Sequence, residues 1–172
     1  MFCSSDVRKR LLFLALSGGA AVFFLFITAG CAPSPYTLKT IDHPHLPKNI
    51  EEYIRSEVRE WEGTPHQWGG TSRKGTDCSG FVMIIYKTLF NIRLPRSTKH
   101  QIRTGVQIPK SQLQAGDLVF FLLPENMRHV GIYLGKGEFA HTSGSKSVMI
   151  SHMDDCYWRN TYETSRRILP YK

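Results

Sequence analysis

Apolar and polar positions divide the chain into an apolar leader, a proline-rich connection and a region with a periodic pattern. Apolar residues run almost unbroken from Leu11 to Gly30, directly after a basic triplet. A basic start followed by such a run is typical of an export signal, although its length would also just span a bilayer. The next stretch carries four prolines and little periodicity, as a stiff extended linker does. We therefore predict a signal segment, a linker and a folded domain, at residues 1–30, 31–48 and 49–172.

Two stretches of the folded domain carry the period of helices with one buried face. The first begins at the N-cap residue Asn49 and ends near Gly63, and its expected buried residues are Ile50, Ile54, Val58 and Trp61. The second follows Asp77, a natural N-cap, so that Cys78 falls in its first turn. Its expected buried residues are Phe81, Val82, Ile84, Ile85, Leu89 and Phe90. A shorter helix is expected to reach from the LPRST block to about Thr104.

Strand patterns fill the second half of the chain. Residues 118–123 form a continuous apolar run, which is typical of a fully buried strand. Four further strands are expected, near residues 129–135, 138–143, 147–153 and 162–169, with glycine-containing turns between the first three. We read these strands as an antiparallel meander. Helices followed by such a sheet predict an α+β fold, with the N-terminal helices packed on the C-terminal sheet.

The length of the chain indicates one folded domain, and its charge indicates the kind of partner. The 172 residues suffice for one domain of ordinary size with an appendage. The formal charge is +8, and removing residues 1–30, with three basic residues and one acidic residue, would leave +6. Because Lys and Arg are scattered, the sequence argues against a nucleic-acid partner. The charge favours an anionic surface, either an acidic envelope polymer or lipid headgroups.

The four cysteines form no close pair of the kind that binds metal or exchanges disulfides. Ala29 and Gly30 directly before Cys31 resemble the lipobox of bacterial lipoproteins, whose cysteine is lipidated and becomes the mature N-terminus, although Thr28 stands where Leu is usual. We therefore expect Cys31 to anchor the chain to a membrane outside the cytoplasm. Cys156, beside two aromatic residues, is expected to be a buried free thiol; a disulfide with Cys78 is the alternative.

Nucleophilic chemistry is the hypothesis that best uses Cys78. A helix N-terminus stabilises a thiolate, and such a nucleophile needs a base whose tautomer is held by a partner. His129 begins one predicted strand and His141 lies near the end of the next, so a hairpin would bring the two imidazoles to one edge. A structural cysteine and a zinc site formed with His66 are the competing interpretations.

Six blocks in fixed order carry a family resemblance. They are GTPHQWGG, GTDCSGFV, LPRST, AGDLVFF, HVGIYLG and FAHTSG. Together they resemble the NlpC family of papain-like cysteine peptidases, which cut bacterial cell-wall peptides. The resemblance extends from about Ile50 to Leu169, nearly the whole predicted domain. It implies a circularly permuted papain-like α+β fold and hydrolysis of the bond between D-glutamate, through its γ-carboxyl, and meso-diaminopimelate in peptidoglycan stem peptides.

The resemblance also assigns roles to individual residues. Cys78 matches the nucleophile, His129 the base and His141 the third polar residue. The substrate contacts that it implies lie at Trp68, Asp77, Ser79 and, in a recurrent block, Arg96, for which a structural ion pair is the alternative. It implies no metal or organic cofactor. We expect a monomer that acts on stem peptides and is held at the membrane by its lipid.

His66 is the departure from the family pattern. The family usually has Tyr at this position, twelve residues before the cysteine, and an imidazole N–H could replace the phenol as a donor to the oxyanion. A side chain that only fills the space of Tyr is the alternative. Two other functions stay open, namely a non-catalytic wall-binding module and another Cys–His amidase or acyltransferase, because a fold does not fix a substrate.

Overall fold

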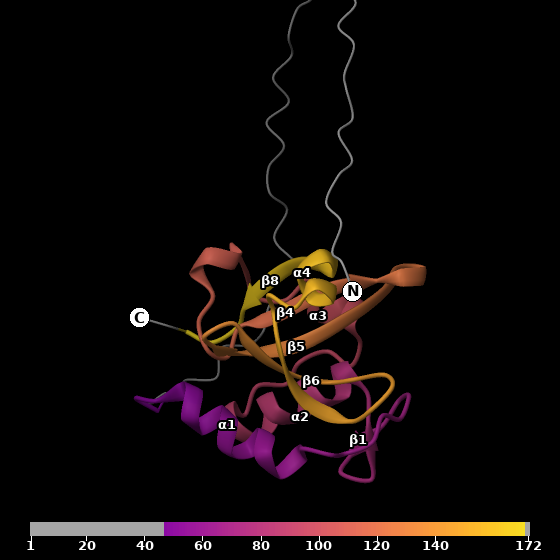
Figure 1. The fold of residues 1–172 in the computed structure, drawn as a ribbon. Coiled ribbons are helices and arrows are strands. Elements are labelled where there is room, and N and C mark those ends of the chain that lie inside the picture. The colour runs from indigo at the N-terminus through magenta and orange to yellow at the C-terminus, as the bar shows by residue number, and fades with distance from the viewer. Residues whose placement is uncertain (1–46, 171–172) are drawn as a thin grey trace, which may run out of the picture. The chain divides into compact units, whose positions relative to one another are not determined.

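The computed structural model describes residues 47–170 (Figure 1). The expected signal segment, the anchor cysteine Cys31 and nearly all of the expected linker lie outside this range. Between residues 47 and 170, none of the helices combines the length and apolar character that crossing a bilayer requires.

The two predicted long helices are confirmed. Helix α1 spans Ile50–Trp61, and the side chain of Asn49 caps it by accepting a hydrogen bond from the Glu52 N–H at 3.1 Å. Helix α2 spans Cys78–Phe90, and Asp77 caps it by accepting from the Gly80 N–H at 2.7 Å. These caps satisfy backbone donors that the first helical turn leaves free, so each helix starts where its cap stands.

Smaller elements surround these helices. A short hairpin of β1 (Thr71–Ser72) and β2 (Gly75–Thr76) leads into α2. Helix α3 spans Thr98–Gln101, so the helix that was expected to reach Thr104 ends three residues earlier.

The main sheet has six antiparallel strands in the order β3-β8-β4-β5-β6-β7. Their bounds are β3 Val106–Ile108, β4 Leu118–Leu123, β5 Met127–Gly135, β6 Glu138–Thr142, β7 Val148–His152 and β8 Tyr162–Arg167. Single 3₁₀ turns occupy Lys110–Gln112 and Pro124–Asn126. The expected meander is correct for β4 to β7. It is wrong for β8, because helix α4 (Cys156–Thr161) carries the chain back to pair β8 with β4.

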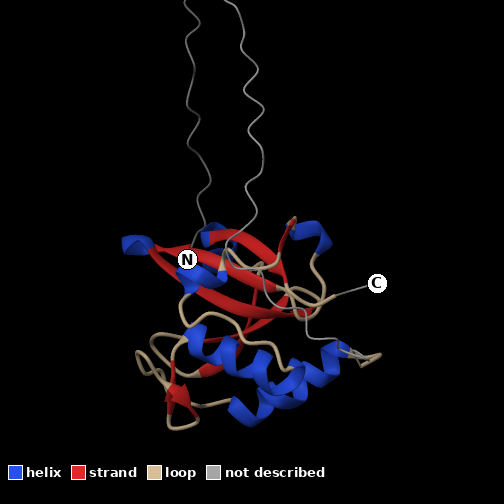
Figure 2. Cartoon of the chain, turned by 180° about the vertical axis from the view of Figure 1, so that it is seen from behind, coloured by secondary structure: helices blue, strands red, loops and turns tan. Residues whose placement is uncertain are grey.

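The two faces of the sheet pack against different helices (Figures 1 and 2). On one face, α1 and α2 form the larger apolar core with residues such as Phe81, Phe120 and Val130. On the other face lies a smaller cluster that includes Phe121, Phe139, Met153 and, partly buried, Trp158 of α4. Helices packed on an antiparallel sheet confirm the α+β class.

The prediction for Cys156 is wrong. Cys156 is exposed at the start of α4 and is not a free thiol, whereas a buried free thiol was expected. The alternative disulfide with Cys78 is also wrong, because Cys78 is free.

Candidate active site

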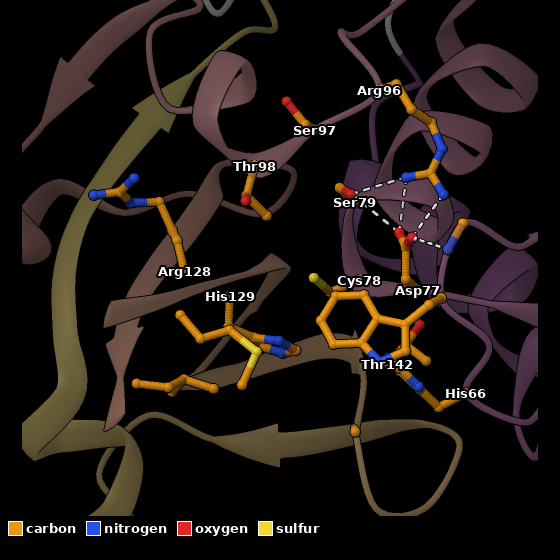
Figure 3. Close-up of a pocket in the computed structure, with 15 residues that line it drawn as sticks. His66, Asp77, Cys78, Ser79, Arg96, Ser97, Thr98, Arg128, His129 and Thr142 are labelled. Atoms are coloured by element: carbon orange, nitrogen blue, oxygen red, sulfur yellow. Dashed lines mark hydrogen bonds and ion pairs between the residues drawn. The ribbon is translucent and has the colours of Figure 1, made fainter. Parts of the chain in front are cut away.

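A cavity of about 650 Å³ opens between the start of α2 and the sheet (Figure 3). It is lined by His66, Trp68, Gly69, Asp77, Cys78, Ser79, Arg96, Ser97, Thr98, Leu123, Met127, Arg128, His129, Thr142 and Gly144. Of the eight site residues predicted within the described range, seven line this cavity, and His141 lies directly behind it through a hydrogen bond to His129.

Cys78 lies half-buried in the first turn of α2, and its sulfur points toward the side of the cavity that carries His129 (Figure 3). Burial raises the pKa of this thiol to about 11, against the opposing effect of backbone N–H groups, first that of Val130, which stabilise the thiolate. The charge of Asp77 raises the pKa further. The thiol is therefore protonated at rest and needs a base to become a nucleophile.

The two predicted histidines meet as expected. His129 Nε2 lies 2.9 Å from His141 Nδ1, and both rings are buried. Burial lowers the pKa of His129 to about 3, with further lowering from His141 and His66, and burial lowers the pKa of His141 to about 4. Both rings are neutral at rest, so His129 is able to accept a proton.

Aromatic rings hold this histidine pair on the side of the sheet away from α2. The ring of Trp158 stacks on His129 at 5.5 Å and 27°, and its edge meets His141 at 4.8 Å and 74°. Phe139 stacks on the other ring, at 4.9 Å and 27° from His141. Flat packing on rings restricts rotation of both imidazoles and keeps water from their hydrogen bond.

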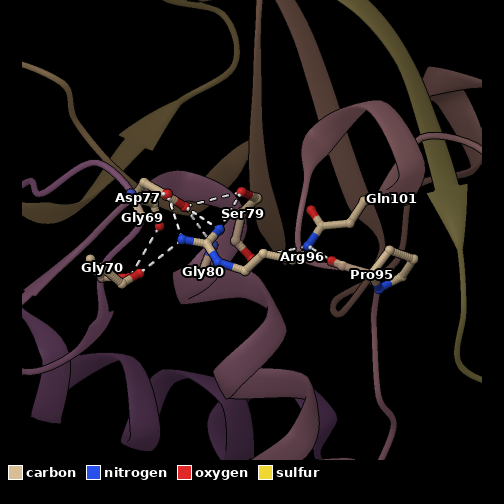
Figure 4. Close-up of polar contacts among 9 residues, drawn as sticks. Gly69, Gly70, Asp77, Ser79, Gly80, Pro95, Arg96 and Gln101 are labelled. Atoms are coloured by element: carbon tan, nitrogen blue, oxygen red, sulfur yellow. Dashed lines mark hydrogen bonds and ion pairs between the residues drawn. The ribbon is translucent and has the colours of Figure 1, made fainter.

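A polar network fixes the residues on either side of the thiol (Figure 4). The Arg96 guanidinium donates to both carboxylate oxygens of Asp77, at 2.8 and 2.6 Å, and to the Ser79 hydroxyl at 3.0 Å. The Gly69 N–H donates to the same carboxylate at 2.8 Å. Burial alone would raise the pKa of Asp77, but Arg96 and the backbone N–H donors outweigh it and hold this pKa at about 2. The ion-pair interpretation of Arg96 thus has direct geometric support.

His66 and Trp68 form another part of the wall, with their rings edge to face at 5.3 Å. Trp68 is 74% exposed, which is unusual for so large an apolar side chain. His66 lies near enough to His129 for its charge to lower the pKa of that ring. This wall therefore offers an apolar platform and an imidazole beside the thiol.

Among residues 47–170, no group of three or more His, Cys, Asp or Glu side chains is placed to hold a metal ion. The zinc interpretation of Cys78 with its histidines therefore has no geometric support in this range. A free thiol, a neutral imidazole and a second imidazole behind it match the arrangement that the sequence led us to expect for a nucleophilic site.

Comparison with known proteins identifies the domain. The model of the NlpC/P60 family matches residues 63–167. The chain belongs to the NlpC/P60 family. This confirms the resemblance inferred from the six blocks.

Individual NlpC/P60 relatives agree with this membership. The chain is 44% identical over 117 residues to the probable endopeptidase NlpC of Escherichia coli K12, covering 67% of this chain and 76% of that protein. It is 40% identical over 121 residues to the murein DD-endopeptidase MepS/murein LD-carboxypeptidase of the same strain, covering 70% of this chain and 64% of that protein. A crystal structure of an NlpC/P60 family protein from Bacillus cereus matches with a TM-score of 0.65 and 35% identity, covering 70% of this chain and 40% of that one. The papain-like α+β fold expected from the sequence is confirmed.

Several residues of this NlpC/P60 site were missed by reasoning from the sequence. The hairpin between β4 and β5 supplies Leu123, Met127 and Arg128 to the cavity wall, and α4 supplies Trp158 behind the histidines. Arg128 directly precedes His129 in β5, and this position was a usable signal, because a neighbour of the expected base lies close to the site. Trp158 gave no such signal, since it reaches the site only through the unexpected return of the chain along α4.

Proposed function

We propose that the chain is a cysteine peptidase that cuts peptidoglycan stem peptides, with Cys78 as nucleophile, His129 as general base and acid, and His141 as the residue that orients it. The observation that carries this proposal is the shared cavity of Cys78 and His129, with His141 hydrogen-bonded behind the base. The two relatives from Escherichia coli described above are named as endopeptidases, and they support a hydrolase acting on the cell wall.

The chemistry follows from the protonation states of these groups. The Cys78 thiol gives its proton to His129 Nδ1 as its sulfur bonds to the substrate carbonyl carbon, and the carbonyl electrons move to oxygen. Collapse of this oxyanion breaks the C–N bond, while His129 returns the proton to the leaving amine. Water then attacks the thioester carbonyl carbon and gives a proton to His129. Collapse of this second oxyanion breaks the C–S bond and releases the carboxylic acid, and His129 returns the proton to sulfur.

Backbone and side-chain donors near the sulfur would stabilise the oxyanion. The Cys78 N–H lies in the first turn of α2, where the helix dipole favours negative charge. We assign the imidazole of His66 to the same side of the site, since it lines the cavity and acts electrostatically on His129. Filling the space of a Tyr side chain is the alternative role of His66.

For the scissile bond, we propose the amide between the γ-carboxyl of D-glutamate and meso-diaminopimelate, as the family resemblance implies. The MepS relative is named for two other activities, DD-endopeptidase and LD-carboxypeptidase, so the cleaved bond has to be identified from the products. Substrate contacts are proposed at Trp68 and Ser79 in the cavity wall. Asp77 and Arg96 satisfy each other, which favours a bracing role for both.

The proposed setting is the bacterial envelope, with the chain tethered by a lipid on Cys31 and working as a monomer without a cofactor. The net charge, +8 for the whole chain and +6 once residues 1–30 are removed, supports attraction to an anionic wall or headgroup surface. A non-catalytic wall-binding module is the alternative, and it would bind sacculi without releasing products.

Purified sacculi and soluble muropeptides incubated with the full chain test this proposal. We expect Cys78→Ala and His129→Gln to abolish product release, whereas His152→Gln, the same change at a histidine outside the cavity, should leave it intact. Mass spectrometry of the products identifies the cleaved bond, because γ-glutamyl cleavage frees a peptide with diaminopimelate at its new N-terminus. Undiminished turnover by Cys78→Ala would refute the mechanism, and sedimentation with sacculi without products would favour the binding module.

A further inference from the structure

The hydrogen-bond chain behind the thiol does not end at His141. The Nε2 atom of His141 lies 3.0 Å from the hydroxyl oxygen of Ser151 on β7, while its Nδ1 atom faces His129 Nε2 at 2.9 Å. His141 is 1% exposed, so both of its ring nitrogens depend on protein partners. Ser151 does not line the cavity and therefore has no place for direct contact with substrate.

Two directions of this hydrogen-bond chain are possible, and only one leaves the base usable. If Ser151 donates to His141 Nε2, then His141 carries its proton on Nδ1 and donates to His129 Nε2. The proton of neutral His129 then sits on Nδ1, the nitrogen that His141 leaves free, so this nitrogen has no lone pair to accept the thiol proton. If Ser151 instead accepts from His141 Nε2–H, then His141 Nδ1 accepts from His129 Nε2–H. His129 Nδ1 is then a free lone pair.

We propose that Ser151 is a positioning residue of the active site, whose hydroxyl accepts a hydrogen bond from His141 Nε2–H and thereby holds both histidines in the tautomers that catalysis needs. This rests on the proposed function, in which His129 Nδ1 takes the thiol proton. The site is thus a line of four residues, Cys78, His129, His141 and Ser151, of which only the first two meet the substrate.

The direction also suits the charged state of the base. When His129 becomes an imidazolium, its Nε2–H still donates to the lone pair of His141 Nδ1, and no second proton has to move. His141 stays neutral and keeps donating to Ser151. Without the Ser151 hydroxyl, His141 Nε2–H would lose the acceptor that lies 3.0 Å away, and losing a hydrogen bond in a buried position is costly. If that proton moves to Nδ1 instead, His141 donates to His129 Nε2, and the hydrogen bonds take the direction that blocks the base.

Nitrogen-15 NMR of the imidazole rings reads these tautomers directly, whether or not the protein cleaves anything. In the full chain at neutral pH we expect His141 to carry its proton on Nε2 and His129 to carry its proton on Nε2. In Ser151→Ala we expect a shift of the His141 proton to Nδ1. A wild-type His141 protonated on Nδ1, or a Ser151→Ala spectrum identical to that of the wild type, overturns the proposal.

Kinetics on a soluble muropeptide provide the second readout. We expect Ser151→Ala to lower kcat about 10- to 100-fold with KM unchanged, because the residue lies outside the cavity. Ser151→Thr keeps a hydroxyl acceptor and should restore most of kcat. Ser165→Ala is the matched control, since it removes another serine hydroxyl of the sheet, bonded to Tyr162 on β8, which β4 separates from the strands of both histidines.

The outcomes separate the two proposals. Expected tautomers in a protein that cleaves no muropeptide would leave the role of Ser151 in place and refute the peptidase. Cleavage by the wild type with equal kcat in Ser151→Ala and Ser165→Ala would refute the role of Ser151 and leave the peptidase. A kcat for Ser151→Thr as low as that for Ser151→Ala would also contradict a hydroxyl-based role.

Discussion

The buried histidine pair should make folding stability fall steeply between pH 7.5 and pH 4.5. The pKa values of His129 and His141 are lowered to about 3 and about 4 because both rings are buried, against about 6.5 in an unfolded chain. A lowered pKa means that the unfolded state binds a proton first, so this stability is fully present above pH 6.5 and is lost as pH falls. At pH 4.5 each histidine costs about 2 to 3 kcal/mol, or about 5 kcal/mol for the pair.

Urea unfolding at the two pH values measures this loss. The comparison is between the wild type and the double variant His129→Gln, His141→Gln, because the difference between their pH dependences cancels every other titrating group. We expect the free energy of unfolding to drop by about 5 kcal/mol more in the wild type than in the double variant. Equal drops in the two proteins would refute the view that these rings are held neutral by burial.

Two further changes test the surroundings of the site. Asp77→Asn should destabilise the fold by about 2 kcal/mol at pH 7, because Arg96 and backbone donors lower the pKa of Asp77 to about 2. In urea unfolding, the variant should also lack the part of the acid sensitivity that the wild type shows between pH 4 and pH 2. Trp158→Ala should lower kcat about tenfold without changing KM, because Trp158 lies outside the cavity but its ring restricts the rotation of His129. Trp158→Phe keeps an aromatic ring and should retain more of the activity. Equal kcat in both variants and the wild type would contradict a role of Trp158 in holding His129.

Local signals explain what could be predicted from the sequence. The start of α2 follows from Asp77, whose cap forms within the next three residues, so Cys78 had to fall in the first turn. The meeting of His129 with His141 follows from a hairpin that turns within a few residues and fixes its own register. Such features depend on neighbours in the chain, and the sequence is sufficient for them.

Contacts between distant segments explain the failures. Strand β8 pairs with β4 rather than with β7, and nothing in its own pattern states which neighbour it chooses. The same return of the chain brings Trp158 of α4 onto the histidines. Ser151 belonged to a correctly predicted strand, yet its importance depends on a single hydroxyl facing a ring on the next strand. A pattern of apolar and polar positions does not reveal which hydroxyl will face which ring.

Burial imposes one more condition on the chemistry of this site. The pKa of Cys78 is raised to about 11 and that of His129 is lowered to about 3, and both changes disfavour a thiolate and imidazolium pair at rest. In the proposed mechanism, proton transfer therefore accompanies attack, when the negative charge leaves sulfur for the substrate oxygen. The imidazolium formed at that moment meets the lone pair of His141 and the stacked face of Trp158, which attracts a cation. These two contacts offset part of the cost of a buried charge, while burial keeps the base neutral at rest, so in the proposed mechanism the thiol is activated with substrate present rather than before it arrives.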